Sequence, residues 1–396
     1  MPNIQPLKYF PAFDGVRGLF CIMIISHHWV MPYLQGPFTF MWWLLQVFFM
    51  LSAYLITRIL LFDKTRMEPK ALFKRFYTRR ILRIFPLYFL YVILIGGLLL
   101  IAGTTELGAK SPDVIYFKQN WGYLFTYTYN FAEIGNHFRG INYVPAPLFS
   151  HLWSLSLEEQ FYFIFPVAIV FLPFNYLKKF VLAFIIAAPF VRLITYYTLN
   201  HINPDTHWLG LISVRNTLFQ LDTLAYGMAI AIFDTSKIKN SVKLFLGVFI
   251  IWIIYTFVSA HYIVQEGGAK TIHTAIKEYT FMTHHMNYVF YFTLTNFMCA
   301  LLVITLVNNT IITKLFTNKP AIFLGRISYG IYVWHYFVML LAAGILNPII
   351  GSHVKYIGNF WAELAMYSFY LALLILVAHL SYKYFEVYFI KLKSKT

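Results

Sequence analysis

Long apolar stretches recur along this chain, and they constrain its fold more than any other feature. Ten of them have about the 20-residue length that an α-helix needs to cross a bilayer. They cover residues 15–33, 41–62, 82–103, 157–173, 180–199, 217–233, 244–264, 288–309, 327–346 and 361–384. Because hydrocarbon offers backbone groups no hydrogen bonds, such segments must form helices. The sequence predicts an all-α polytopic membrane protein of about ten transmembrane helices, folded as a single transmembrane domain over residues 1–396.

The composition excludes several other classes of protein. Only 12% of the residues are charged, whereas a soluble domain carries about a quarter. Two cysteines, Cys21 and Cys299, cannot build a disulfide framework or a cysteine-based zinc site. We find no P-loop motif, which disfavours an ATP-driven pump. We expect no metal, because the histidines show no convincing metal-ligand pattern. We expect no nucleic-acid partner, because no basic patch lies outside the membrane flanks.

The distribution of basic residues predicts the orientation of the chain. Most of its 31 Lys and Arg residues fall on one side if the N-terminus is cytoplasmic, as the excess of positive charge in cytoplasmic loops requires. Both termini are then cytoplasmic. The segment 63–83 is a strongly basic cytoplasmic stretch, and residues 104–150 form a long extracytoplasmic loop. A loop of that length usually has a function or its own packing.

Ionisable residues within the first apolar segment indicate a functional site, because they are costly in a membrane. Arg17 and His28 are eleven residues apart, which places them on one helix face, separated by roughly 16 Å. Asp14 precedes Arg17 by three residues and can pair with it. A single buried histidine is commonly structural, but a cation and an imidazole aligned on one face favour function.

Other polar residues have both a functional and a structural interpretation. Glu158 opens the fourth span, where a carboxylate could simply face water at a helix N-terminus. Arg80 and Arg83 share a helix face and suit phosphate oxygens, although basic residues before a span also serve as anchors. His335 lies within the ninth span, and a buried ion pair between Arg192 and Asp222 would join the fifth and sixth.

Several short motifs, taken in order, resemble the acyltransferase-3 family of membrane acyltransferases from Phe13 to about Leu392. The first is Phe13-Asp14-Gly15-Val16-Arg17-Gly18, continuing to His28. The most recognisable is Trp153-Ser154-Leu155 followed by Glu158. The others lie at residues 48–57, 76–88, 327–335 and 381–386. Departures from the family pattern occur at Gln46, Ala53, Gln220 and Tyr388, and they put in doubt roles assigned to Gln46 and Gln220.

This resemblance implies an enzyme of the inner (plasma) membrane, surrounded by membrane lipid. Such enzymes move an acyl group, usually acetyl, from cytosolic acyl-CoA to a hydroxyl of a cell-surface glycan or glycolipid. Acetyl-CoA would be a donor substrate and no cofactor would be tightly bound. Because the chain ends soon after its last span, it resembles the stand-alone type without an additional C-terminal hydrolase-like domain.

The resemblance also suggests roles for individual residues. Acyl transfer needs a base and stabilisation of a developing oxyanion. His28 would be the base or a transient acyl carrier. Arg17, ordered by Asp14, would contact the thioester region, and Glu158 would orient His28 or the acceptor. Phosphates of CoA would be held by Arg79, Arg80 and Arg83. The remaining residues predicted to line the site are His335, Ser328, Tyr329, Trp153, His151 and Asp222.

Two other classes of function remain as alternatives. Polar residues inside spans suit a transporter of a glycan intermediate or small solute equally well, although the chain has no inverted repeat and no paired Gly- or Pro-broken segments. A non-catalytic scaffold would tolerate replacement of His28, Arg17 and Glu158. Dependence on acyl-CoA distinguishes the enzyme from both.

Overall fold

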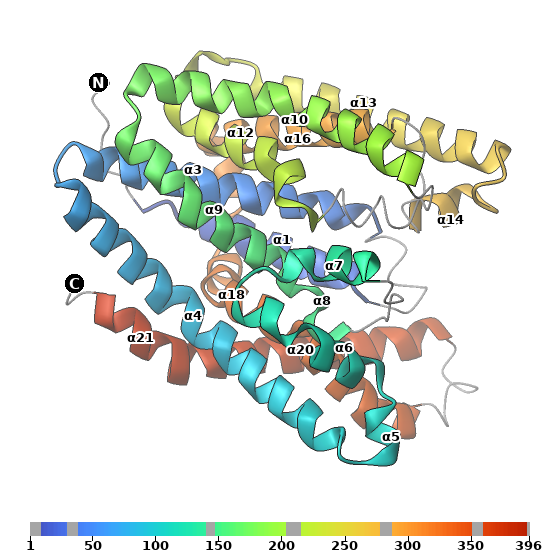
Figure 1. The fold of residues 1–396 in the computed structure, drawn as a ribbon. Coiled ribbons are helices and arrows are strands. Elements are labelled where there is room, and N and C mark those ends of the chain that lie inside the picture. The colour runs from blue at the N-terminus through green and yellow to red at the C-terminus, as the bar shows by residue number, and fades with distance from the viewer. Residues whose placement is uncertain are drawn as a thin grey trace. The chain divides into compact units, whose positions relative to one another are not determined.

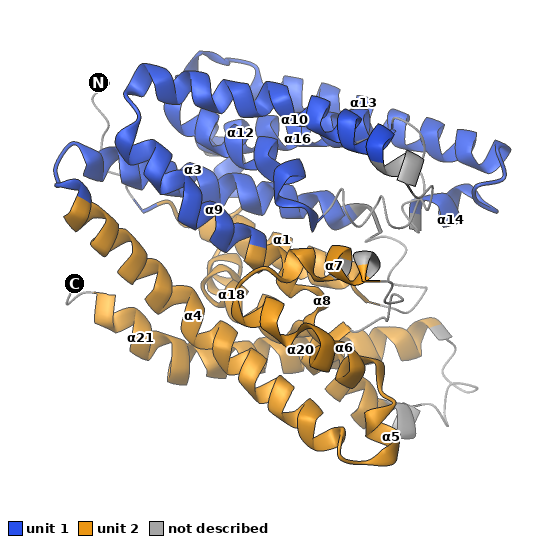
Figure 2. Ribbon diagram, in the orientation of Figure 1, with its two compact units in different colours: residues 1–9, 39–69, 157–315 blue, residues 10–38, 70–156, 316–396 orange. Residues whose placement is uncertain are grey.

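The computed structural model describes residues 9–29, 39–139, 147–202, 215–277, 287–350 and 359–393, and all regular elements in these ranges are helical (Figure 1). The chain divides into two compact units, each built from segments far apart in the sequence (Figure 2). Unit 1 comprises residues 1–9, 39–69 and 157–315, and unit 2 comprises residues 10–38, 70–156 and 316–396.

Within the described ranges, eight helices are long and apolar enough to cross a membrane. They are Met41–Lys64, Pro69–Ala102, Pro147–Phe171, Phe174–Thr198, Ser241–Gln265, Val289–Asn308, Lys319–Leu346 and Phe360–Leu392. The prediction of an all-α polytopic membrane protein is confirmed. The first and sixth predicted segments correspond to shorter helices, α1 (Pro11–His27) and Thr217–Ile232. Residues 30–33 of the first predicted segment lie outside the described residues.

Unit 1 is a bundle of long helices with buried polar contacts between several of them. Its main helices are α3 (Leu44–Lys64), α10 (Phe174–Ile202), α12 (Leu221–Ile232), α13 (Ser241–Gln265), α16 (Asn287–Asn308) and most of α9 (Leu152–Phe171). Its short elements are η1 (Thr39–Trp43), η3 (Thr217–Gln220), η4 (Thr235–Lys237), α14 (Ile272–Lys277) and α17 (Thr310–Lys314). The backbones of α12 and α3 approach closely, since a Cβ on Gly227 would lie 2.3 Å from the Met50 carbonyl oxygen.

Unit 2 contains α1, α4 (Pro69–Ala102), α18 (Lys319–Ile350), α20 (Asn359–Ser381), a π-helical turn η5 (Tyr382–Glu386) and α21 (Val387–Leu392). Pro11 begins α1, where no backbone N–H is needed, and Asp14 lies in its first turn, where negative charge is favourable. Small residues then allow α1 and α18 to touch through their backbones. A Cβ on Gly325 would lie 1.9 Å from the Asp14 carbonyl oxygen, and one on Gly18 would lie 2.5 Å from that of Ala321.

The predicted loop 104–150 is folded wherever it is described. It forms α5 (Glu106–Ala109), α6 (Pro112–Phe125), η2 (Tyr129–Phe131), α7 (Ala132–Phe138) and α8 (Pro147–Ser150). The backbone of Leu148 is held from both sides: its N–H donates to Asp113 Oδ1 (3.2 Å), and its carbonyl accepts from Tyr91 Oη (2.6 Å). Burial raises the pKa of the Asp113 carboxyl, and the Leu148 hydrogen bond opposes this. These contacts fix α8 directly before His151.

The basic segment 63–83 is largely helical. The apolar span was expected from residue 82, and α4 begins at Pro69, so Arg79, Arg80 and Arg83 lie on the same helix near the start of that span. Lys and Arg are good helix formers, so a basic stretch can extend an apolar helix out of the membrane.

Candidate active site

Three histidines from three parts of unit 2 gather at one place. His28 is the C-cap residue of α1, His335 lies in the middle of α18, and His151 lies between α8 and α9. His28 Nδ1 is 3.1 Å from His335 Nε2, and these two rings stack with centroids 5.1 Å apart. The His151 and His335 centroids are 4.6 Å apart. The structure thus brings together one residue predicted as catalytic and two predicted to line the site.

The close crossing of α1 and α18 explains why His28 and His335 meet. His28 follows Gly18 by ten residues, and His335 follows Gly325 by ten residues. A Cβ on Gly18 would lie 2.5 Å from the Gly325 nitrogen, so the two helices are in register at these glycines. Two parallel helices that touch there carry both histidines roughly 15 Å further along the same direction.

His335 and His151 are both anchored to carbonyl oxygens of α18. His335 Nδ1 lies 2.6 Å from the Tyr332 oxygen, and His151 Nε2 lies 3.1 Å from the Val333 oxygen. His335 has 0% exposure and His151 has 2%, whereas His28 is half-buried. Of these three histidines, His28 therefore has the exposed side-chain surface that a substrate could contact.

Hydroxyl groups connect His151 to α18. Ser154 Oγ and Tyr332 Oη are 2.6 Å apart, and both lie within hydrogen-bond distance of the His151 carbonyl oxygen, at 3.1 and 3.0 Å. The Tyr336 ring stacks on His28 with centroids 5.2 Å apart. Tyr332 and Tyr336 were missed in the sequence, although they lie three residues before and one residue after His335.

A second polar contact lies next to His28 and joins α1 to α20. Trp29 Nε1 donates to Glu363 Oε1 (3.2 Å), and both side chains are buried. The hydroxyl groups of Ser26 and Tyr367 also hydrogen-bond. Glu363 lies outside the family motifs, so its contact with Trp29, the residue after His28, became apparent only in the fold.

Basic residues gather where α4 and α21 come together in unit 2. Burial, together with the positive charges of Arg83, Arg80 and Arg79, lowers the pKa of Lys393 to about 8. Glu386 is buried, and its carboxyl group interacts electrostatically with the positive charge of Arg83. Tyr329 Oη donates to the Ile84 carbonyl oxygen (2.7 Å) and links α18 to this part of α4. The predicted phosphate-binding arginines thus have a further basic neighbour, Lys393.

The other predicted residues lie in both units. In unit 2, Asp14 and Arg17 are half-buried on α1, and Trp153 is buried at the start of α9. Ser328 Oγ donates to the Gly325 carbonyl oxygen (2.9 Å). The pairing of Asp14 with Arg17 stays a prediction. Glu158 belongs to unit 1, so its predicted action on His28 also stays a prediction.

Asp222, predicted to line the site, forms a buried ion pair in unit 1. Its Oδ1 lies 2.5 Å from Arg192 Nη2, and the same nitrogen donates to the Phe219 carbonyl oxygen. Arg192 has 0% and Asp222 1% exposure. The ion pair that the sequence suggested between the fifth and sixth spans is therefore present, and it ties α10 to α12.

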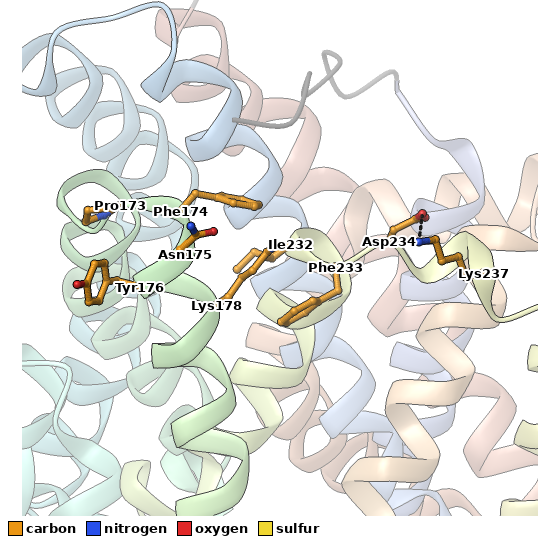
Figure 3. A pocket seen from close by; sticks show the side chains of 9 residues that line it. All are labelled: Pro173, Phe174, Asn175, Tyr176, Lys178, Ile232, Phe233, Asp234 and Lys237. Atoms are coloured by element: carbon orange, nitrogen blue, oxygen red, sulfur yellow. Dashed lines mark ion pairs between the residues drawn. The ribbon is translucent and has the colours of Figure 1, made fainter.

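Within the described ranges, no group of three or more His, Cys, Asp or Glu side chains is arranged to hold a metal ion. A pocket of about 820 Å³ in unit 1 lies between the start of α10 and the end of α12 (Figure 3). Lys178 Nζ lies 4.9 Å from the Phe174 ring centroid there. No predicted site residue lines this pocket.

The fold and the three histidines define an all-α polytopic membrane protein with a polar cluster within one helical unit. A sequence model described as an acyltransferase domain matches residues 10–383, and the chain belongs to this acyltransferase family. Membership favours the enzyme over the transporter and scaffold alternatives. No solved structure shows a significant match to the chain.

Relatives of known name agree with the family assignment. A Staphylococcus aureus (strain COL) protein provisionally named an O-acetyltransferase is 26% identical over 98% of this chain. The peptidoglycan O-acetyltransferase OatA of Listeria monocytogenes and the O-acetyltransferase OatA of Staphylococcus aureus (strain NCTC 8325) are each 25% identical over 96% of it. The chain spans 58%, 55% and 57% of the lengths of these three relatives.

Proposed function

We propose that this protein is a membrane O-acyltransferase that moves an acetyl group from cytosolic acetyl-CoA to a hydroxyl of a cell-envelope glycan. The observation that carries the proposal is the contact of half-buried His28 with fully buried His335, in a chain of the acyltransferase family. Peptidoglycan is the first acceptor to test, because the Listeria relative is named for it. The proposed location is the inner (plasma) membrane, with both termini in the cytoplasm.

His28 supplies the central chemistry of this proposal. As a general base, it takes the proton of the acceptor hydroxyl while the hydroxyl oxygen attacks the thioester carbonyl carbon. The carbon–sulfur bond then breaks, and the CoA thiolate receives a proton. In the alternative route the imidazole nitrogen attacks the thioester first and carries the acetyl group to the hydroxyl. Arg17 contacts the thioester region, and Glu158 orients His28 or the acceptor.

Donor binding is assigned to the basic end of α4. Arg79, Arg80 and Arg83 hold the CoA phosphates, because guanidinium groups form paired, charge-assisted hydrogen bonds with phosphate oxygens. We also propose that His335, Ser328, Tyr329, Trp153 and His151, all in unit 2, line the site. Asp222 is left out of the chemistry, since its carboxylate pairs with Arg192.

Transfer of radiolabelled acetyl from acetyl-CoA to a cell-envelope glycan extract tests this proposal. Purified wild-type protein in detergent is compared with His28→Ala, which should lose transfer by at least about a hundredfold while its thermal unfolding is unchanged. His27→Ala is the matched control and should keep activity. Normal transfer by folded His28→Ala would overturn the assignment. Label that stays on wild-type protein without acceptor favours the carrier route.

A further inference from the structure

The partners of His335 determine where the protons of the histidine pair lie. The Tyr332 carbonyl oxygen can only accept a hydrogen bond, so His335 Nδ1, 2.6 Å away, must carry the proton. A second proton on Nε2 would make His335 an imidazolium with 0% exposure, which is costly inside a protein. His335 Nε2 is therefore a lone-pair acceptor.

This arrangement fixes the tautomer of His28 in turn. His335 Nε2 accepts across 3.1 Å, so the hydrogen bond is donated by His28 Nδ1. Neutral His28 then carries its lone pair on Nε2. A histidine side chain in water prefers the opposite tautomer, with the proton on Nε2, so an acceptor facing Nδ1 is needed to hold this one.

We infer that His335 is a positioning residue that selects the reactive nitrogen of His28. The Tyr332 carbonyl orients His335, and His335 holds the Nδ1–H tautomer of His28, which leaves Nε2 to take the hydroxyl proton or attack the thioester. The inference rests on the proposed role of His28 in the chemistry. The stacking of the two rings keeps the His28 plane fixed as well, with 17° between them.

The protons balance along this pair. When His28 Nε2 takes a proton from the acceptor hydroxyl, His28 becomes an imidazolium whose Nδ1–H still donates to His335 Nε2. The acceptor oxygen forms its bond to the acyl carbon, the bond to sulfur breaks, and the Nε2 proton passes to the CoA thiolate. His335 keeps the same proton throughout, so it acts through His28 and does not touch substrate.

Two substitutions of similar size separate positioning from simple packing. In His335→Gln, the amide oxygen can take the place of the Nε2 acceptor that faces His28. In His335→Asn, the shorter amide can still donate to the Tyr332 oxygen, but it no longer reaches His28. We expect kcat to fall roughly ten- to a hundredfold in His335→Asn, with KM for acetyl-CoA unchanged, and to stay within about fivefold of wild type in His335→Gln.

Nitrogen-15 NMR of histidine-labelled protein reads the tautomer directly, without any assay of activity. The His28 signals are identified by their loss in His28→Ala. We expect the Nδ1–H form at His28 in wild type and His335→Gln, and its loss in His335→Asn. An Nε2–H form in wild type, or an unchanged tautomer in His335→Asn, overturns the inference.

The kinetic and spectroscopic results separate the two proposals. Equal losses of kcat in the Gln and Asn variants would reduce His335 to a packing residue and overturn the inference, with His28 still essential. Full activity of His28→Ala would instead overturn the proposed function, whatever tautomer the NMR spectrum shows. If either His335 variant fails to fold, the wild-type tautomer alone decides the inference.

Discussion

Individual side chains in unit 2 concentrate polar chemistry in two places, the histidine pair of α1 and α18 and the cluster formed by the arginines of α4 with Lys393. Arg17, His28, Arg80 and Arg83 were predicted from residue type and helical spacing alone. The partners of these residues were not predicted as partners, because they come from distant segments. His335 is 307 residues from His28 in the sequence, and Lys393 follows the last helix.

At this scale the pKa of Lys393 predicts how donor binding depends on pH. Burial and the neighbouring arginines lower this pKa to about 8, so Lys393 loses its charge as the pH rises from 7 to 9. If Lys393 joins the arginines in holding CoA phosphates, KM for acetyl-CoA should rise roughly two- to tenfold over this range, as when a contact of about 0.5–1.5 kcal/mol is lost.

Lys393→Arg should flatten this dependence, because arginine stays protonated at these pH values. Lys391→Arg, a change at an exposed residue of α21, is the matched control and should keep the wild-type profile. KM is measured for all three proteins between pH 6.5 and 9. The same pH profile in wild type and Lys393→Arg would remove Lys393 from donor binding.

Elements of unit 2 are placed by close approaches of helix backbones as well as by apolar side chains. A hydrophobic driving force between helices is weak inside lipid, so small residues at a crossing contribute through van der Waals contact. Gly18 and Gly325 have this role where α1 meets α18. The crossing positions the histidines further along both helices, so packing at one end determines geometry at the other.

Gly325→Ala tests this coupling between packing and site geometry. Its Cβ would lie 1.9 Å from the Asp14 carbonyl oxygen, so the helices must separate. We expect a loss of about 1–3 kcal/mol in the free energy of unfolding, and a fall in acetyl transfer as His28 moves away from His335. Thermal unfolding in detergent and the transfer assay measure the two effects.

Gly344→Ala is the control on the same helix. A Cβ there would have no neighbour within 4 Å, and alanine is the better helix former by roughly 0.5–1 kcal/mol. This variant should be as stable as wild type or slightly more so, with normal transfer. Equal behaviour of the two variants would show that α1 and α18 do not cross as closely as described.

For the whole molecule, the distribution of basic residues makes a prediction about sidedness. Both native cysteines are buried, so a cysteine introduced on the surface reports its own side of the membrane. Lys391→Cys replaces an exposed residue of α21, and Glu106→Cys lies on α5 at a side chain with 92% exposure. With both termini cytoplasmic, an impermeant maleimide should label Glu106→Cys in intact cells and Lys391→Cys only after permeabilisation. The reverse pattern would invert the proposed orientation.

The sequence by itself determined the class of protein, most of its long helices and the face of α1 that carries Arg17 and His28. It could do so because backbone groups in a bilayer must be satisfied within each segment, which makes apolar length a direct signal of a helix. The apolar pattern marked the third span but not the full length of α4, which begins earlier because Lys and Arg continue a helix readily. The short helices of the 104–150 loop were not predicted, because none of them contains an apolar run long enough to span a membrane.

Only the tertiary structure decided which residues meet. Apolar spans look alike in composition, so nothing in the sequence specifies that α1 crosses α18 at Gly18 and Gly325, or that Lys393 comes near the arginines of α4. Those contacts depend on the shapes of helix surfaces and on a few small residues that let backbones approach. The physical reason is range: helix formation is local, whereas the pairing of His28 with His335 requires the packing of two helices far apart in the chain.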